Sequence, residues 1–202
     1  MGREGIRRMK LVLGENKSLA VVVIAHERRM NSTFPLVMQS VVDEQPDEIV
    51  CVADFHCVGP WRHIMVPAFT KTTIDALIKR DVGFVATQSD SVMYLSDDHV
   101  LCKGFVQAFR EHEQDWDILV PGRCADKDGQ PVRLNVGQAT NYCAGHGGIY
   151  KRRCGNILPW TATIPHPNWD VINSHHLIAN GCVMTYTDKL FIQDIEGGTP
   201  WL

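Results

Sequence analysis

The sequence predicts an α/β protein in which helices cover both faces of one mostly parallel sheet. Continuous apolar, β-branched runs alternate along the chain with segments of helical periodicity, as in sheets whose parallel strands are joined by helices. Apolar residues make up 45% and charged residues 21% of the 202 residues, so the chain can bury a core without disulfide or metal support. We expect a basic tail over residues 1–18 and a single domain over residues 19–202.

The first strand and helix are predicted at residues 19–25 and about 33–41. LAVVVIA (19–25) is an unbroken apolar run, which is typical of a strand buried on both faces. Ser32 or Thr33 then supplies a helix cap, and Pro35 suits the first turn of the helix.

The alternation continues through the middle of the chain. EIVCVAD (48–54) is a second apolar strand that ends in a carboxylate. Apolar residues recur at helical spacing over 71–86, which predicts an amphipathic helix carrying Lys79 and Arg80. VMYL (92–95) follows as the next strand.

The last elements are separated by an irregular region. We expect a helix over about 104–114, a strand at WDILVP (116–121), a helix from Asp170 to about Asn180 and a strand at VMTYT (183–187). Residues 122–168 are rich in turns and glycine, and so long an irregular region in a compact domain is usually functional or mobile.

Charge, cysteines and hydropathy narrow the class of protein. The net charge of −3 disfavours binding of nucleic acid by charge alone. Seven cysteines without regular spacing indicate reduced thiols and a cytoplasmic protein. The longest apolar run is residues 19–25, too short for a membrane span, which takes about 20 residues.

Three carboxylates follow predicted strands. Asp54 ends the second strand, and the adjacent Asp97 and Asp98 come directly after VMYL. In open α/β sheets ligands bind outside the carboxyl ends of the strands, and Mg²⁺ and Mn²⁺ take one or two carboxylates together with substrate phosphates and water. The pattern favours a metal and nucleotide site, although Asp97 and Asp98 are also consistent with the mere start of a loop.

Four segments carry a resemblance to a known family. VVVIAHER (21–28), DEIVCVADFHC (47–57), KRDVGFVAT (79–87) and SDSVMYLSDD (89–98) resemble, in order and spacing, the GT-A glycosyltransferases, closest to the inverting family-2 group. The similarity covers about residues 19–110 and, more loosely, 143–194. It implies that residues 19–121 form a nucleotide-binding half and residues 122–202 an acceptor-side half of a GT-A-like domain.

The resemblance also implies roles for individual residues in donor binding. Asp54 would contact the nucleotide base, Asp97 the ribose side, and Asp98, with Asp97, the metal. The histidine that often serves the family as third metal ligand would be lost here or replaced by Asp194. Further residues matched to nucleotide-sugar binding are Ala25, His26, Glu27, Lys79, Arg80, Gly147 and Gly148. Lys79, Arg80 or Lys151 would assist the departing diphosphate.

The catalytic base implied by the resemblance is Asp170. In NWDVINSHHLIANG (168–181) this residue matches the aspartate that opens a helix in the family, with Trp169 in place of the usual glutamate. A carboxylate at this position is also explained by the helix dipole alone. The glycines of CAGHGGIYKRR (143–153) are likewise consistent with an ordinary turn.

The expected function is metal-dependent transfer, with Mn²⁺ or Mg²⁺, of a sugar from a UDP- or GDP-linked donor to an acceptor hydroxyl. The acceptor would be a glycan or another hydroxyl, including a modified nucleobase in DNA. One alternative is a binding module that has lost catalysis, which Ala53 and Trp169 favour because both replace family carboxylates. A nucleotidyltransferase is the other, and HERRM (26–30) lacks the glycines that its triphosphate loop needs.

Overall fold

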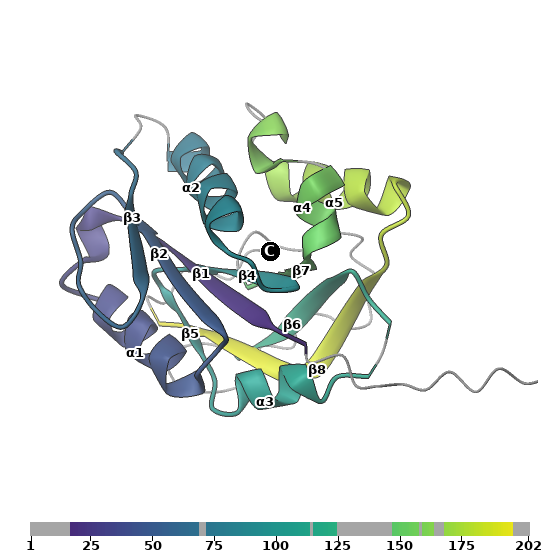
Figure 1. Ribbon diagram of the computed structural model, residues 1–202, viewed down its shortest axis with the longest axis horizontal. Helices are drawn as coiled ribbons and strands as arrows, with labels where there is room; N and C mark the ends of the chain where they lie inside the picture. The colour runs from purple at the N-terminus through teal and green to yellow at the C-terminus, as the bar shows by residue number, and fades with distance from the viewer. Residues whose placement is uncertain are drawn as a thin grey trace, which may run out of the picture.

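The structure, a computed structural model, describes residues 17–68, 72–113, 115–124, 147–157, 159–163 and 168–195. Eight strands within these ranges form one sheet in the order β3-β2-β1-β4-β7-β6-β8-β5 (Figure 1). The predicted basic tail and most of the irregular region 122–168 lie outside the described residues.

The half of the sheet nearest the N-terminus is parallel. β1 (Leu19–Ala25) lies between β2 (Glu48–Ala53) and β4 (Ser91–Ser96). β3 (Arg62–Met65) pairs with the outer edge of β2, also in parallel. Ala25 pairs with Ala53, and Ile24 pairs with Ser96. Three strands therefore end at nearly the same level, and the residues that follow them meet at one edge.

The other half of the sheet contains the antiparallel pairings. β7 (Ile149–Lys151) runs antiparallel to both β4 and β6 (Ile118–Cys124). β8 (Met184–Asp194) is parallel to β6, and β5 (His99–Leu101) is antiparallel to β8. The predicted α/β sheet with mainly parallel pairing is confirmed, and the antiparallel pairings of β5 and β7 were not predicted.

Helices cover both faces of the sheet, as predicted (Figure 1). α1 (Phe34–Glu44) and α3 (Phe105–Arg110) pack on one face. The other face is covered by the three helices α2 (Thr72–Ala86), α4 (Arg152–Ile157) and α5 (Trp169–Ala179). Alternate residues of β1 enter the two resulting cores, and the whole strand is buried.

Several element boundaries differ from the predicted ones. The helix expected over 104–114 is shorter, because Gly104, with φ of 84°, precedes its first residue and the helix ends at Arg110. β8 extends to Asp194, well beyond the predicted residue 187. The short strands β3, β5 and β7 were not predicted, because three or four residues are too few to show a periodic pattern.

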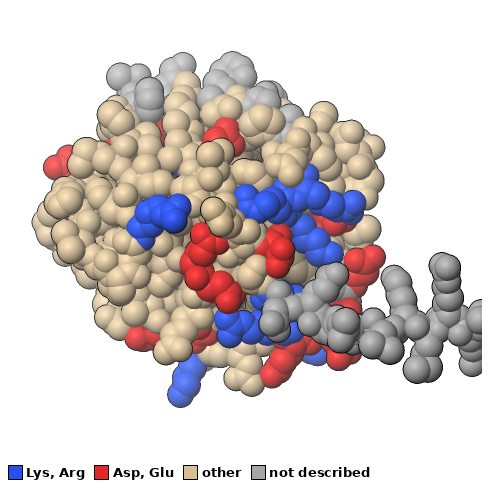
Figure 2. Space-filling model, in the orientation of Figure 1, with Lys and Arg blue, Asp and Glu red and all other residues tan. Residues whose placement is uncertain are grey.

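Charge on the surface is mixed. Figure 2 shows Lys and Arg side chains lying among Asp and Glu side chains, without a large area of one sign on the face in view. This arrangement fits the net charge of −3. Within the described ranges, no helix combines the length and the apolar character that crossing a bilayer requires.

Candidate functional site

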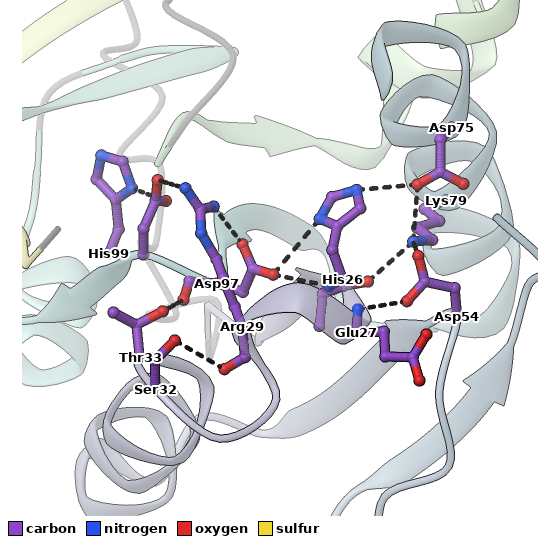
Figure 3. A network of polar contacts seen from close by, with 12 residues as sticks. His26, Glu27, Arg29, Ser32, Thr33, Asp54, Asp75, Lys79, Asp97 and His99 are labelled. Carbon is purple, nitrogen blue, oxygen red and sulfur yellow. Dashed lines mark hydrogen bonds and ion pairs between the residues drawn. The ribbon is translucent and has the colours of Figure 1, made fainter. Parts of the chain in front are cut away.

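The candidate site is built where β1, β2 and β4 end. His26 follows β1, Asp54 follows β2 and Asp97 follows β4. The backbone N–H of His26 donates to Oδ2 of Asp97 over 2.7 Å, and the N–H of Glu27 donates to Oδ1 of Asp54 over 2.6 Å (Figure 3). The segment after β1 thus ties together the acids of its two neighbouring strands.

Arg29 compensates the charge of the adjacent aspartates. Its Nη1 atom lies 2.6 Å from Oδ1 of Asp97, and its Nη2 atom lies 2.9 Å from Oδ2 of Asp98. The single-turn 3₁₀ helix η1 (Glu27–Arg29), which is separated from β1 by His26 alone, places the guanidinium there. The two carboxylates that follow β4 therefore face the guanidinium of Arg29, which comes from the turn after the neighbouring strand β1.

The other two oxygens of this acid pair also have partners. Oδ2 of Asp97 accepts the N–H of His26 and lies 3.4 Å from Nδ1 of the same residue. Oδ1 of Asp98 lies 2.6 Å from Nδ1 of His99. Burial of Asp97 opposes its ionisation, but hydrogen bonds from His26 and Arg29, with the charge of Arg29, outweigh burial and lower the pKa of Asp97.

A second cluster joins helix α2 to the same strand ends. Nζ of Lys79 lies 2.8 Å from Oδ2 of Asp75 and 3.2 Å from Oδ2 of Asp54, and it donates to the carbonyl of Ala25 over 2.8 Å. Oδ2 of Asp75 lies 2.9 Å from Nε2 of His26. His26 therefore connects the two clusters, contacting Asp75 on one side and Asp97 on the other (Figure 3).

Lys79 and Arg80, both predicted to bind the donor, lie inside the protein with exposures of 0% and 2%. The ammonium of Lys79 is held by its three oxygen partners. The guanidinium carbon of Arg80 lies 4.4 Å from the ring centre of Trp169 and 5.5 Å from that of Trp160. In this arrangement Lys79 supports Asp54, and Arg80 fixes the start of α5.

Lys151 does not reach the site, so the expectation that it assists the diphosphate is wrong. Lys151 lies opposite Ser91, the first residue of β4, in the antiparallel pair of β4 and β7. Asp97 comes after the last residue of β4, at the other end of that strand. Its Nζ atom lies 5.2 Å from the ring centre of Trp116. Lys151 therefore belongs to the opposite edge of the sheet.

Gly147 and Gly148 lie beside β4 and are buried. The N–H of Gly147 donates to the carbonyl of Tyr94 over 2.7 Å, so in this arrangement it serves the sheet. A side chain at Gly147 would place its Cβ 2.2 Å from Cδ1 of Ile192, and its φ of 77° favours glycine. Packing against Ile192 and the positive φ therefore explain why residue 147 is a glycine.

Asp170 lies in the first turn of α5 and is half-buried. Its Oδ1 atom accepts the N–H of Val171 over 2.9 Å. Asp170 is not part of the network at the strand ends. The contact between Arg80 and Trp169 nevertheless places its helix against α2, which carries Asp75 and Lys79.

The chemistry of the acid pair fits a divalent cation with few protein ligands. Asp97 and Asp98 offer the carboxylate oxygens that Mg²⁺ and Mn²⁺ prefer. Asp194 lies nearby, since it pairs with His99 across β5 and β8. In the described part of the chain no three His, Cys, Asp or Glu side chains form a metal-binding group. Phosphate and water would have to supply the remaining ligands.

Sequence reasoning missed four polar residues of the site: Arg29, Asp75, His99 and Thr33. The signal for Asp75 was its spacing of four residues from Lys79 on an amphipathic helix, which allows an ion pair. Thr33 was expected as a helix cap and does precede α1, but its hydroxyl donates to the carbonyl of Asp97 over 2.6 Å.

Solved structures share this architecture, although the sequence matches no protein-family profile and no curated protein. A structure of S. aureus TarS 1–349 superposes with a TM-score of 0.65 at 14% identity, covering 88% of this chain and 60% of that one. A second S. aureus TarS structure gives 0.63 at 12% identity, with 88% of this chain and 36% of that one covered.

A structure of GalNAc-T7 with UDP, GalNAc and Mn²⁺ is also similar. Its TM-score is 0.64 at 14% identity, and the match covers 91% of this chain and 45% of GalNAc-T7. TarS and GalNAc-T7 both have the GT-A fold, so the predicted GT-A-like fold is confirmed. The chain spans 60% or less of each of these proteins.

Proposed function

We propose that this chain transfers a sugar from a nucleoside-diphosphate donor, UDP- or GDP-linked, to an acceptor hydroxyl with inversion. One observation carries the proposal: the residues that directly follow β1, β2 and β4 form one polar network. This network lies at the sheet edge where ligands of open α/β sheets bind. The GT-A-like fold supports it, and GalNAc-T7, which shares that fold, was crystallised with UDP, GalNAc and Mn²⁺.

The donor's nucleoside would bind along the ends of β1 and β2. Asp54 accepts the ring N–H of uracil or guanine in this proposal, beside Ala25, His26 and Glu27, while Asp97 lies on the ribose side. Each carboxylate oxygen has two lone-pair positions, so the existing bonds from Glu27 and Lys79 leave Asp54 able to accept another. The same bonds hold the carboxylate in one orientation.

The metal in this proposal is Mn²⁺ or Mg²⁺, held by Asp98 and Asp97 with Asp194 nearby. When bound, such a cation neutralises the charge that develops on a departing diphosphate. The chain's own contribution is to hold the two carboxylates side by side at the end of β4. His99 and Thr33 support that position through the Asp98 carboxylate and the Asp97 carbonyl.

Asp170 is the proposed general base, which would take a proton from the acceptor hydroxyl. The stacking of Arg80 on Trp169 makes Arg80 a positioning residue for this carboxylate, because it fixes the first turn of α5 against α2. The acceptor class is a glycan or another hydroxyl, including that of a modified nucleobase in DNA. A cytoplasmic location remains a prediction from the cysteine pattern of the sequence.

A binding module without catalysis is the second candidate function. The observation in its favour is that all four carboxylate oxygens of Asp97 and Asp98 already have partners within the protein. Such a module would bind a nucleotide sugar and leave it intact. The two candidates share the fold and the donor site, so turnover separates them.

Nucleotide-sugar screening tests the proposed function. UDP- and GDP-linked sugars with Mn²⁺ should raise the melting temperature, and the stabilising donor should then be hydrolysed slowly or transferred to an added acceptor. Donor binding without turnover, across glycan and nucleoside acceptors, would favour the binding module. An absence of donor binding would contradict both candidates.

A further inference from the structure

We propose that Arg29 is an internal counter-cation that competes with divalent metal for Asp97 and Asp98, so that metal binds tightly only together with the donor diphosphate. This inference rests on the proposed function, because it concerns the same site. It gives Arg29 control over when metal binds, a role separate from that of the proposed metal ligands Asp97 and Asp98.

The contacts of Arg29 place one guanidinium across two carboxylates. Nη1 contacts Asp97 and Nη2 contacts Asp98 at 2.6 and 2.9 Å. The three side chains are shielded from water, with exposures of 14% for Arg29, 1% for Asp97 and 17% for Asp98. Charge-assisted hydrogen bonds are the stronger kind, and low exposure to water strengthens them further.

The backbone keeps the guanidinium in place. The N–H of Arg29 donates to the carbonyl of His26 over 2.9 Å, and the N–H of Ser32 donates to the carbonyl of Arg29 over 3.1 Å. Because His26 itself donates to Asp97, the turn and the acid pair are fixed to each other. The two carboxylate oxygens that Arg29 contacts each have a second lone-pair position, but a metal bound there would lie next to the positive guanidinium. Metal binding to Oδ1 of Asp97 and Oδ2 of Asp98 therefore competes with Arg29.

Charge explains why the donor would change the outcome of this competition. Asp97 and Asp98 carry two negative charges against the single positive charge of Arg29. A donor diphosphate adds further negative charge beside them, which one guanidinium does not balance and a divalent cation balances better. The phosphates also supply oxygen ligands beyond those that the described residues offer. Metal and donor should therefore bind with positive coupling, which is reciprocal by linkage.

Direct measurement of Mn²⁺ binding tests the inference. The signal of free Mn²⁺ in electron paramagnetic resonance gives its affinity with and without UDP, for the wild type and for Arg29→Gln. Removal of the two charge-assisted bonds should tighten Mn²⁺ binding without UDP by about tenfold or more. The further gain on adding UDP should shrink by a similar factor, because the competitor is already absent.

Arg28→Gln is the matched control. Arg28 is exposed on the same turn, so its loss removes an equal charge without freeing the acid pair, and Mn²⁺ affinity should stay near the wild-type value. Combining Arg29→Gln with Asp98→Asn should abolish the gain in Mn²⁺ affinity, because the oxygen that Arg29 releases at residue 98 then belongs to a neutral amide. If Arg29→Gln fails to fold, Arg29→Lys retains a charge but not the planar fork, and its Mn²⁺ affinity should be intermediate.

Unchanged Mn²⁺ affinity in Arg29→Gln would overturn the inference, as would an equal gain in Arg28→Gln or no Mn²⁺ binding in any variant. Failure of the proposed function gives a different result. In that case Arg29→Gln would still bind Mn²⁺ more tightly than the wild type, while no nucleotide sugar would be turned over.

Discussion

The ammonium of Lys79, which has no exposed surface, lies 3.2 Å from Oδ2 of Asp54 and so joins helix α2 to the end of β2. Oδ2 of Asp75 and the carbonyl of Ala25 complete its surroundings, each at 2.8 Å. A buried ammonium without such partners would be costly. The residue thus links the stability of the fold to the orientation of a proposed nucleotide-binding carboxylate.

Lys79→Met should destabilise the protein strongly. The substitution keeps much of the apolar stem but leaves Asp54 and Asp75 without their shared cation, and removal of one partner of a buried ion pair costs about 3–5 kcal/mol. Urea unfolding measures the change. Lys103→Met, at an exposed lysine, is the control, and equal small effects at both positions would contradict the role given to Lys79.

The stability that Asp97 contributes should depend on pH. Its pKa is lowered from 3.8 by His26 and Arg29 against the effect of burial. A lowered folded-state pKa gives stability that is full above the unfolded value and is lost as the pH falls through the folded one. The unfolding free energy of Asp97→Asn should therefore lie well below that of the wild type at pH 7, and the gap should narrow below about pH 4.

Melting curves of the wild type and Asp97→Asn between pH 7 and pH 3 provide the measurement. If the difference in unfolding free energy between the two proteins stays constant from pH 7 to pH 3, the negative charge of Asp97 does not contribute to stability. Asp43→Asn, at an exposed aspartate of α1 that accepts a hydrogen bond from Gln39, should have little effect at any pH.

Asp54→Ala should weaken nucleotide binding by about 1.5–3 kcal/mol, the scale of a hydrogen bond to a charged group. Calorimetry with UDP and GDP measures the loss, and Asp188→Ala, at an exposed aspartate of β8, provides the control. Because Asp54 also contacts Glu27 and Lys79, melting temperatures must be compared. Normal nucleotide affinity with a much lower melting temperature would make Asp54 purely structural.

Asp98→Asn should reduce the stabilisation that Mn²⁺ adds to nucleotide binding. The amide keeps the size of the side chain but replaces an anionic oxygen ligand with a neutral one. UDP affinity with Mn²⁺ should then fall toward the value measured in chelator, while the value in chelator should change little. Identical behaviour of the variant and the wild type with Mn²⁺ would remove Asp98 from the metal site.

The three inner strands of the parallel half, β1, β2 and β4, were predictable because they are longer, apolar and largely buried. The run at residues 19–25 and that at 48–53 match β1 and β2 closely. β5 and β7 were not predictable, since each has three residues and is defined by its partners: β5 pairs with β8 and β7 with β4. Such strands are determined by their pairing with distant segments of the chain, which the local sequence pattern does not show.

The sequence predicted the site's acids at the strand ends and, through the family resemblance, the neighbouring His26 and Glu27. The positions of Asp54, Asp97 and Asp98 followed from their place after apolar strands, and the structure does bring them to one edge. Their partners did not follow, because Arg29 and Asp75 lie far from these acids in sequence and meet them only through the strand order β2-β1-β4. Lys79 was predicted to bind the donor, and in the structure three oxygens hold its ammonium inside the protein.

The most direct measurement is sugar transfer, or slow donor hydrolysis, by the wild type and by Asp170→Asn, with donor affinity measured alongside. The substitution keeps the size of the side chain and removes the proton acceptor. Turnover should fall by roughly 10²–10⁴-fold, the usual contribution of a general base, while donor affinity stays within a few-fold of the wild type, because the base acts only in the chemical step. Unchanged turnover in Asp170→Asn, or no turnover by the wild type across donors and acceptors, would contradict the proposal.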